Sequence, residues 1–156
     1  MLAPTASPAS ASPRYADPRV DLEELERVLQ GVADEVEGED GRWQLRLGEV
    51  PLACMTDLHF DRMRIIAPIV ELDEVSDELR DQCLEANFHT TLDARYATSD
   101  GVLYAAFIHP LSPLDAEQVE SALRQVANLV ETFGTTFSSG ELVFGAPPRG
   151  RGGLMN

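Results

Sequence analysis

Apolar residues near the start of the chain recur at alternating spacings of three and four, the period of an amphipathic helix. These positions are Leu22, Leu25, Leu29, Val32 and Val36. Asp21 precedes them, and Glu24 follows three residues later, which is a start signal for a helix. The pattern predicts a helix from about residue 22 to Gly38, and the face opposite the apolar stripe is strongly acidic.

Alternation of apolar and polar residues replaces this helical spacing after Gly41. Trp43, Leu45 and Leu47 lie two positions apart, as in a strand with one buried face. Gly48-Glu49 supplies a turn, and residues 50–58 continue as a second apolar strand, so a β-hairpin is predicted. A third strand is predicted over residues 62–70, interrupted near its end by Pro68.

The middle of the chain predicts a short helix followed by a second hairpin. Ser76 is a favourable N-cap, and the helix is expected to run to about Asn87. Two further strands are predicted over residues 94–98 and 102–109, joined by the hairpin signal Asp100-Gly101. Both faces of the later strand are apolar, which indicates that both are substantially covered.

A long helix is predicted after Pro113. Asp115 and Gln118 form a capping box at its start, and Gly134 is well placed to end it. Its apolar stripe comprises Val119, Ala122, Leu123, Val126, Leu129, Val130 and Phe133. Residues 142–144 could add a short extended segment.

The predicted order α-β-β-β-α-β-β-α indicates an α+β fold in which a twisted antiparallel sheet packs against helices. One domain is expected over residues 19–144. Residues 1–18 are dominated by Ala, Pro and Ser, and residues 145–156 by Gly, Pro and Arg. Both segments are expected to be flexible tails, because such compositions bury little apolar surface.

The charge of the chain narrows its possible partners. The formal net charge is −15, and all twelve basic residues are arginine. Such a negative chain repels phosphate backbones and anionic membrane surfaces, so neither nucleic acid nor membrane is an expected partner. The lack of lysine excludes Schiff-base chemistry and the phosphate-binding lysine of a nucleotide-binding loop.

Candidate chemistry is sparse. Cys54 and Cys83 are too few for a disulfide framework, and no secretory signal or apolar membrane span is found, so a cytoplasmic location is expected. The cysteines lie five and six residues before His59 and His89, which is not the spacing of structural zinc sites. No metal site, cofactor or catalytic residue is predicted. A small hydrolase or metal protein with an unrecognised site is the remaining enzymatic alternative.

Three segments resemble the class I type III secretion chaperone family. Cys83-Leu-Glu-Ala-Asn-Phe88 is similar to the segment that closes that family's middle helix. Ser99-Asp-Gly-Val-Leu-Tyr104 is similar to its late hairpin, and His109-Pro-Leu-Ser-Pro-Leu-Asp115 to the entry of its last helix. The resemblance covers roughly residues 20–133. The YbjN domain family shares the same element order and is a second resemblance.

The chaperone resemblance implies a homodimer that binds a polypeptide. It assigns the dimer interface to the second helix and the late hairpin, at Leu79, Leu84, Phe88, Tyr96, Tyr104 and Phe107. It assigns partner binding to the first helix and the first three strands, at Leu25, Leu29, Leu45, Leu47, Leu52, Met55 and Ile65. The alternative for both sets is an ordinary core role, since periodic apolar residues are usually interior.

The sequence therefore predicts a non-enzymatic protein that holds a segment of another polypeptide, such as a secreted effector or a regulatory protein, in an extended state. Its acidity is expected to favour capture of a basic segment. The alternative function is that of a YbjN-like regulatory or accessory module, which binds a folded partner.

Overall fold

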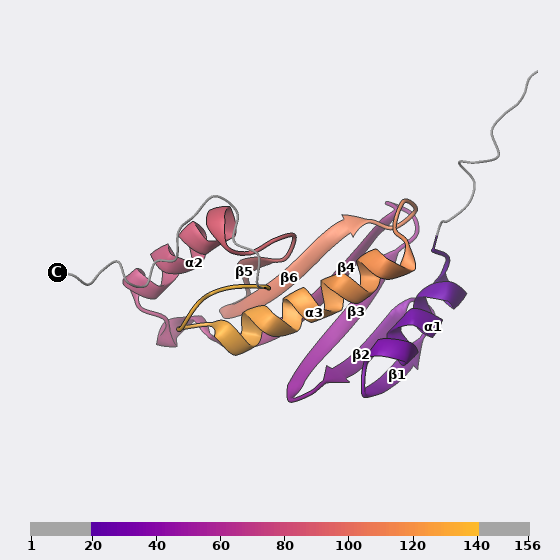
Figure 1. Ribbon diagram of the computed structural model, residues 1–156, viewed down its shortest axis with the longest axis horizontal. Helices are drawn as coiled ribbons and strands as arrows, with labels where there is room; N and C mark the ends of the chain where they lie inside the picture. Colours follow the sequence, from indigo (N-terminus) through magenta and orange to yellow (C-terminus); the bar gives the residue numbers. More distant parts are fainter. Residues whose placement is uncertain (1–19, 141–156) are drawn as a thin grey trace, which may run out of the picture.

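The structure is a computed structural model that describes residues 20–140. Its elements in chain order are α1 (Leu22–Val32), β1 (Glu35–Glu39), β2 (Arg42–Leu47), β3 (Val50–Asp57), β4 (Arg62–Glu71), the 3₁₀ turn η2 (Leu72–Glu74), α2 (Asp77–His89), β5 (Arg95–Ser99), β6 (Val102–Pro110) and α3 (Ala116–Thr132). The predicted tails and the segment 142–144 lie outside the described residues. The α+β class and the helix-flanked antiparallel sheet are confirmed (Figure 1).

One antiparallel sheet organises the structure, in the strand order β1-β2-β3-β4-β6-β5. The first four strands follow one another as a meander, because each is joined to the next by a tight turn. The chain then leaves the sheet through α2 and returns as the β5–β6 hairpin, with β6 beside β4. This makes β1 and β5 the two edges of the sheet.

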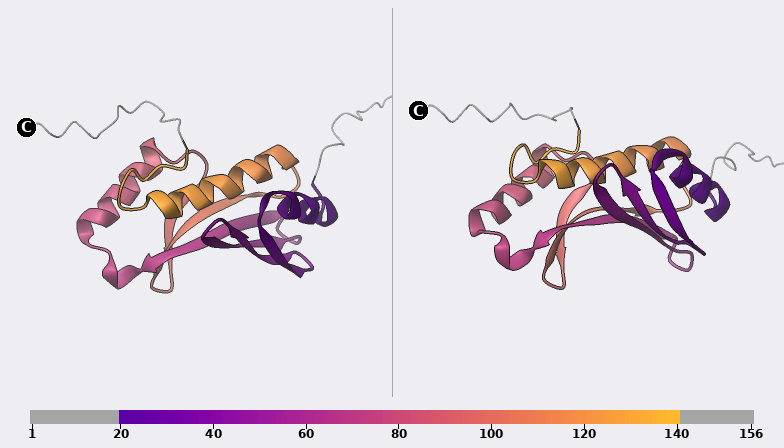
Figure 2. Two further views of the ribbon diagram at one scale, coloured as in Figure 1. Left: turned by 60° about the horizontal axis from the view of Figure 1, so that its bottom comes forward. Right: turned by 90° about the horizontal axis from the view of Figure 1, so that it is seen from below.

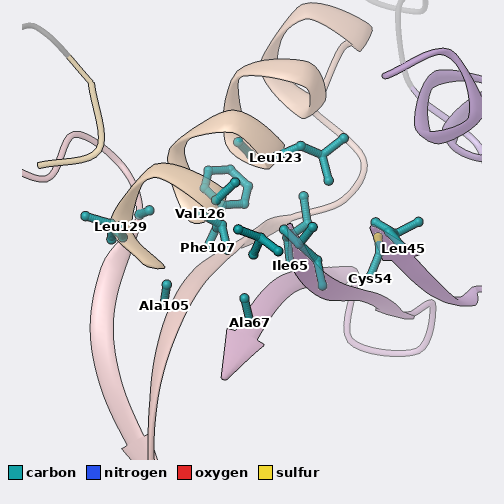
Figure 3. Packing of buried hydrophobic residues seen from close by; sticks show 14 of the residues in the cluster. Leu45, Cys54, Ile65, Ala67, Ala105, Phe107, Leu123, Val126 and Leu129 are labelled. Carbon is teal, nitrogen blue, oxygen red and sulfur yellow. The ribbon is translucent and has the colours of Figure 1, made fainter. Parts of the chain in front are cut away.

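The two faces of the sheet differ because α1 and α3 lie on the same side of it (Figure 2). On this core face, paired residues of neighbouring strands are both buried, as in the pairs Leu45 with Leu52 and Ile65 with Phe107. The labelled α3 side chains Leu123, Val126 and Leu129 lie over these strands (Figure 3). In the strands every second side chain faces this core, and in the helices an apolar stripe that repeats about every 3.6 residues faces it.

The predicted helix starts agree with the observed capping hydrogen bonds. The Asp21 carboxylate accepts from the Glu24 backbone N–H at 2.8 Å, and the Ser76 hydroxyl accepts from the Leu79 backbone N–H at 3.1 Å. Asp115 and Gln118 cap each other's backbone N–H groups at the start of α3. These bonds satisfy donors that a helix end leaves without partners.

The predicted end of the first helix at Gly38 is wrong. The helix ends at Val32, and residues 35–39 form the edge strand β1 paired with β2, so four strands precede α2 instead of three. The physical cause is the turn Asp40-Gly41, in which both residues have positive φ, of 56° and 84°. Such a turn matches the twist of two antiparallel strands and favours a hairpin here over a longer helix.

Candidate polypeptide-binding surfaces

Most of the predicted partner-binding residues lie inside the core. Their positions are as follows: Leu25, Leu29, Leu45, Leu52 and Ile65 are buried, whereas Leu47 and Met55 are half-buried. Leu47 packs against the core cluster, while Met55 lies on the opposite face of the sheet. The alternative given in the sequence analysis, an ordinary core role, therefore fits the five buried residues. Met55 is the residue of this set that offers accessible surface on the face without helices.

The predicted dimer-interface residues divide in a similar way. Tyr96 and Phe107 are buried, and Leu79 and Tyr104 are half-buried. Leu84 and Phe88 are 67% and 81% exposed, which is unusual for large apolar side chains spaced by four residues on one helix. They form an apolar pair on the outer face of α2.

Helix α2 is held to the sheet by buried side chains and by side-chain hydrogen bonds. Cys83 and Ala86 are its buried residues, and its main contact in the sheet is the edge strand β5. The Asn87 side chain pairs with the Tyr96 backbone, donating to its carbonyl oxygen at 3.1 Å and accepting from its N–H at 2.8 Å. Asn87 therefore occupies hydrogen-bonding groups of β5 and fixes the orientation in which Leu84 and Phe88 face outward.

A second exposed apolar pair occurs in the turn between β3 and β4, where Leu58 and Phe60 are 65% and 67% exposed. The Phe60 ring packs edge to face against His59, with ring centroids 4.6 Å apart. Sequence reasoning missed this pair as a surface feature. Its signal was the presence of two large apolar residues inside a polar turn bounded by Asp57 and Asp61.

The cysteine thiols have the environment of core residues. Burial raises the pKa of the Cys54 thiol to about 12 and that of the Cys83 thiol to about 11. Both thiols are therefore protonated at neutral pH, and a protonated thiol is a poor nucleophile and a poor metal ligand. Within residues 20–140, no three His, Cys, Asp or Glu side chains cluster as metal ligands would.

The cleft between β6 and α3 has a volume of about 340 Å³ and is lined by Asp93, Phe107, His109, Glu117, Gln118 and Ser121. Two of its polar groups are engaged within the protein: His109 Nδ1 lies 2.8 Å from the Pro110 carbonyl oxygen, and Ser121 Oγ accepts from Gln125. In the described part of the chain, no hydrogen bond joins a serine or cysteine to a histidine. The nucleophile and base pairing of a hydrolase is thus not found there.

None of the helices in residues 20–140 is both long and apolar enough to cross a membrane.

No protein-family model matches the chain, and no curated protein matches it in sequence. Solved structures do match its fold. A chain of the HopA1-SchA chaperone-effector complex is 13% identical with a TM-score of 0.55, over 72% of this chain and 88% of that one. A chain of the ExsC-ExsE complex is 17% identical with a TM-score of 0.53, over 70% and 90%.

A third match is the Yersinia Pestis type III secretion chaperone SycH, in a structure of its complex with a stable fragment of YscM2. The identity is 17% and the TM-score 0.53, over 72% of this chain and 96% of that one. At such low identities the likeness establishes the fold alone. The chain therefore has a type III secretion chaperone-like fold, as its sequence segments predicted.

Proposed function

We propose that this protein is a non-enzymatic, homodimeric chaperone of the type III secretion class that holds a segment of a partner polypeptide. The matched structures support a polypeptide partner, since each is described as a complex. The observation that carries the proposal is the apolar pair Leu84 and Phe88, which α2 exposes in a single chain. A fold that presents large apolar side chains to solvent is typically one that binds another chain.

The dimer forms across α2 in this proposal. A two-fold axis beside α2 places Leu84 and Phe88 of one protomer against the same residues of its partner, which is the self-complementary contact that such symmetry requires. Leu79 and Tyr104 of the predicted interface are half-buried, and Leu79 packs against the core of its own chain. Tyr96 and Phe107 are buried in the core of their own chain.

The partner segment binds away from α2, on the surfaces that α1 and the first four strands provide. Met55 on the open sheet face and the pair Leu58 and Phe60 in the β3–β4 turn are the accessible apolar groups there. An extended segment gains affinity by placing alternate side chains on such positions. The cytoplasmic location remains the sequence-based prediction.

The proposal is tested by expressing the full chain together with the polypeptides encoded beside it and purifying it under native conditions. The expected result is a near-stoichiometric complex in which limited proteolysis leaves one client segment of tens of residues protected. Retention of an intact, protease-resistant globular partner would favour the YbjN-like accessory role. Recovery of the chain without any polypeptide would contradict both.

A further inference from the structure

The sheet face opposite α1 and α3, called the open face here, has a regular arrangement of side chains. Because antiparallel partners point to the same side, strand register assigns each residue to one face. One row across four strands reads Arg42, Met55, Arg64 and Ile108, from β2 to β6. The row beside it contains the small or apolar residues Ala53, Ile66 and Ala106. Figure 2 shows this face turned away from α1 and α3.

Most arginines of the described residues lie on this face, although the chain as a whole is strongly acidic. Residues 20–140 contain eight arginines: Arg27, Arg42, Arg46, Arg62, Arg64, Arg80, Arg95 and Arg124. Strand register places five of them on the open face, namely Arg42, Arg46, Arg62, Arg64 and Arg95. The carboxylates of the same face lie at its margins: Glu35, Glu37 and Glu39 on the edge strand β1, and Asp57 and Glu71 at strand ends.

Three of the five arginines already donate to an oxygen acceptor. Arg62 Nη1 donates to the Asp61 carbonyl oxygen at 3.1 Å. Arg46 forms an ion pair with Glu35 at 3.0 Å, and Arg95 donates to the Leu92 and Ala94 carbonyl oxygens at 2.6 and 2.8 Å. Arg42, Arg62 and Arg64 are exposed, and none of the three forms an ion pair within the described part of the chain. Their guanidinium groups therefore surround Met55 with charge that is available to a ligand.

We infer that the open face binds a segment of the partner polypeptide that carries carboxylates on either side of an apolar side chain. The inference rests on the proposed function and names the chemistry of its partner. The apolar side chain contacts Met55 and Ile108, while aspartate or glutamate residues pair with Arg42 and Arg64. Arg42 and Arg64 each lie one strand away from Met55, about 5 Å on either side.

Three properties of these residues suit a ligand that combines carboxylates with an apolar side chain. Arginine binds carboxylates through two parallel hydrogen bonds, so two arginines that flank one apolar site recognise acidic groups at a defined spacing. Met55 has an unbranched, adaptable side chain that suits contact with different apolar groups. Arg42 Nη1 lies 3.8 Å from Met55 Sδ, so the charge is immediately beside the apolar contact. A basic segment, which the acidic α1 attracts, is repelled here.

The inference is tested with a library of random twelve-residue peptides displayed on phage and panned against the immobilised full chain. The wild-type chain is expected to enrich clones with several Asp or Glu residues around a central apolar residue. Synthetic peptides from those clones are then titrated against the wild type and against Arg64→Glu. The charge-reversed variant is expected to bind at least about fivefold more weakly, and the wild-type affinity to fall with added salt.

Arg124→Glu is the matched control, because Arg124 is an exposed arginine on α3 whose only ion pair in residues 20–140 is with Glu120. The Arg124→Glu variant has the same change in net charge as Arg64→Glu and is expected to bind the peptides like the wild type. Enrichment of basic or uncharged peptides, or equal binding by Arg64→Glu, would overturn the inference while leaving a polypeptide-binding function intact. A library that enriches no peptide would contradict both. A loss of dimer mass in Arg64→Glu would instead identify the open face as a contact between copies of this chain.

Discussion

Gly38 occupies a position in β1 that other residues cannot adopt without strain. Its φ is +133°, and a Cβ built there would lie 2.2 Å from the Arg42 carbonyl oxygen. We expect Gly38→Ala to lower the free energy of unfolding by about 1–3 kcal/mol, because both the backbone and the β1–β2 pairing must shift. Urea denaturation followed by circular dichroism measures this change.

Gly31 provides the control for that substitution. It lies in α1, and a Cβ added to it has no atom within 4 Å other than those of its chain neighbours and its own helix backbone. Gly31→Ala is expected to raise the free energy of unfolding by about 0.5–1 kcal/mol, since alanine favours a helix more than glycine does. Equal effects of the two substitutions would show that β1 is not formed as described.

The two thiols are expected to be unreactive in the native state. The pKa of each is raised from its ordinary value of 9.0, to about 12 for Cys54 and about 11 for Cys83, by burial. At pH 8, labelling with a thiol-specific disulfide reagent should be slow for the native chain and fast in urea. The single variants Cys54→Ala and Cys83→Ala show which thiol reacts at which rate. Fast labelling of both thiols in the native chain would contradict their burial.

The same shifts fix the sign of a pH dependence. Because the folded pKa of each thiol lies above its unfolded value, the protonated thiol is favoured in the native state. The stability that this burial contributes is fully present below about pH 9 and is lost as the pH rises through the folded values of about 11 and about 12.

Residue patterns predicted burial better than exposure. The period of the apolar residues identified the core face, so Leu25 and Ile65 are buried, as their spacing allows. It did not identify which apolar residues stay exposed: Leu84 and Leu25 both occur in helical patterns, yet only Leu84 faces solvent. That difference depends on which elements pack together, which a single helix does not encode.

At the scale of elements, the Asn87 side chain provides two of the hydrogen bonds that attach α2 to the sheet. Removing the Asn87 amide would leave the Tyr96 backbone groups without their partners. We expect Asn87→Ala to lower the free energy of unfolding by about 1–3 kcal/mol and to increase hydrogen exchange in α2 and β5 more than in β3. Gln82→Ala, an exposed position on the same helix, is the control. Equal exchange in both variants would contradict this role of Asn87.

The outer face of α2 gives a sharp test of the dimer. Leu84→Asp is expected to shift the chain to monomers in sedimentation velocity, without lowering its thermal stability as a monomer, because Leu84 makes little contact within its own chain. Leu58→Asp is the matched control, with the same substitution at a nearly equal exposure of 65%. A dimer that survives Leu84→Asp, or dissociates equally with both variants, would place the interface elsewhere.

Element boundaries were predictable where a local signal was unambiguous. The capping residues Ser76 and Asp115 and the turn Asp100-Gly101 fixed the starts of α2, α3 and β6 closely. At the end of the first helix two signals competed, since Val32 and Val36 extend the helical spacing whereas Asp40-Gly41 favours a hairpin. Pairing with β2 decides for the hairpin, and this pairing is tertiary information.

At the scale of the whole molecule, charge is divided between surfaces. The net charge of −15 predicted a basic partner from the sequence. Strand register collects Arg42, Arg62 and Arg64 on one sheet face, which the total charge concealed. Residues that are distant in sequence form that surface only after the sheet has assembled, so its chemistry could not be predicted from composition or local motifs.

The most direct measurement is the mass of the purified full chain by light scattering during size-exclusion chromatography, alone and after expression with its client. The single chain has a mass of 17.1 kDa, so the account predicts twice that value, 34.2 kDa, for the chain alone and a dimer with added client mass for the complex. A mass of 17.1 kDa in both experiments, with no retained polypeptide, would contradict the homodimeric polypeptide-binding function.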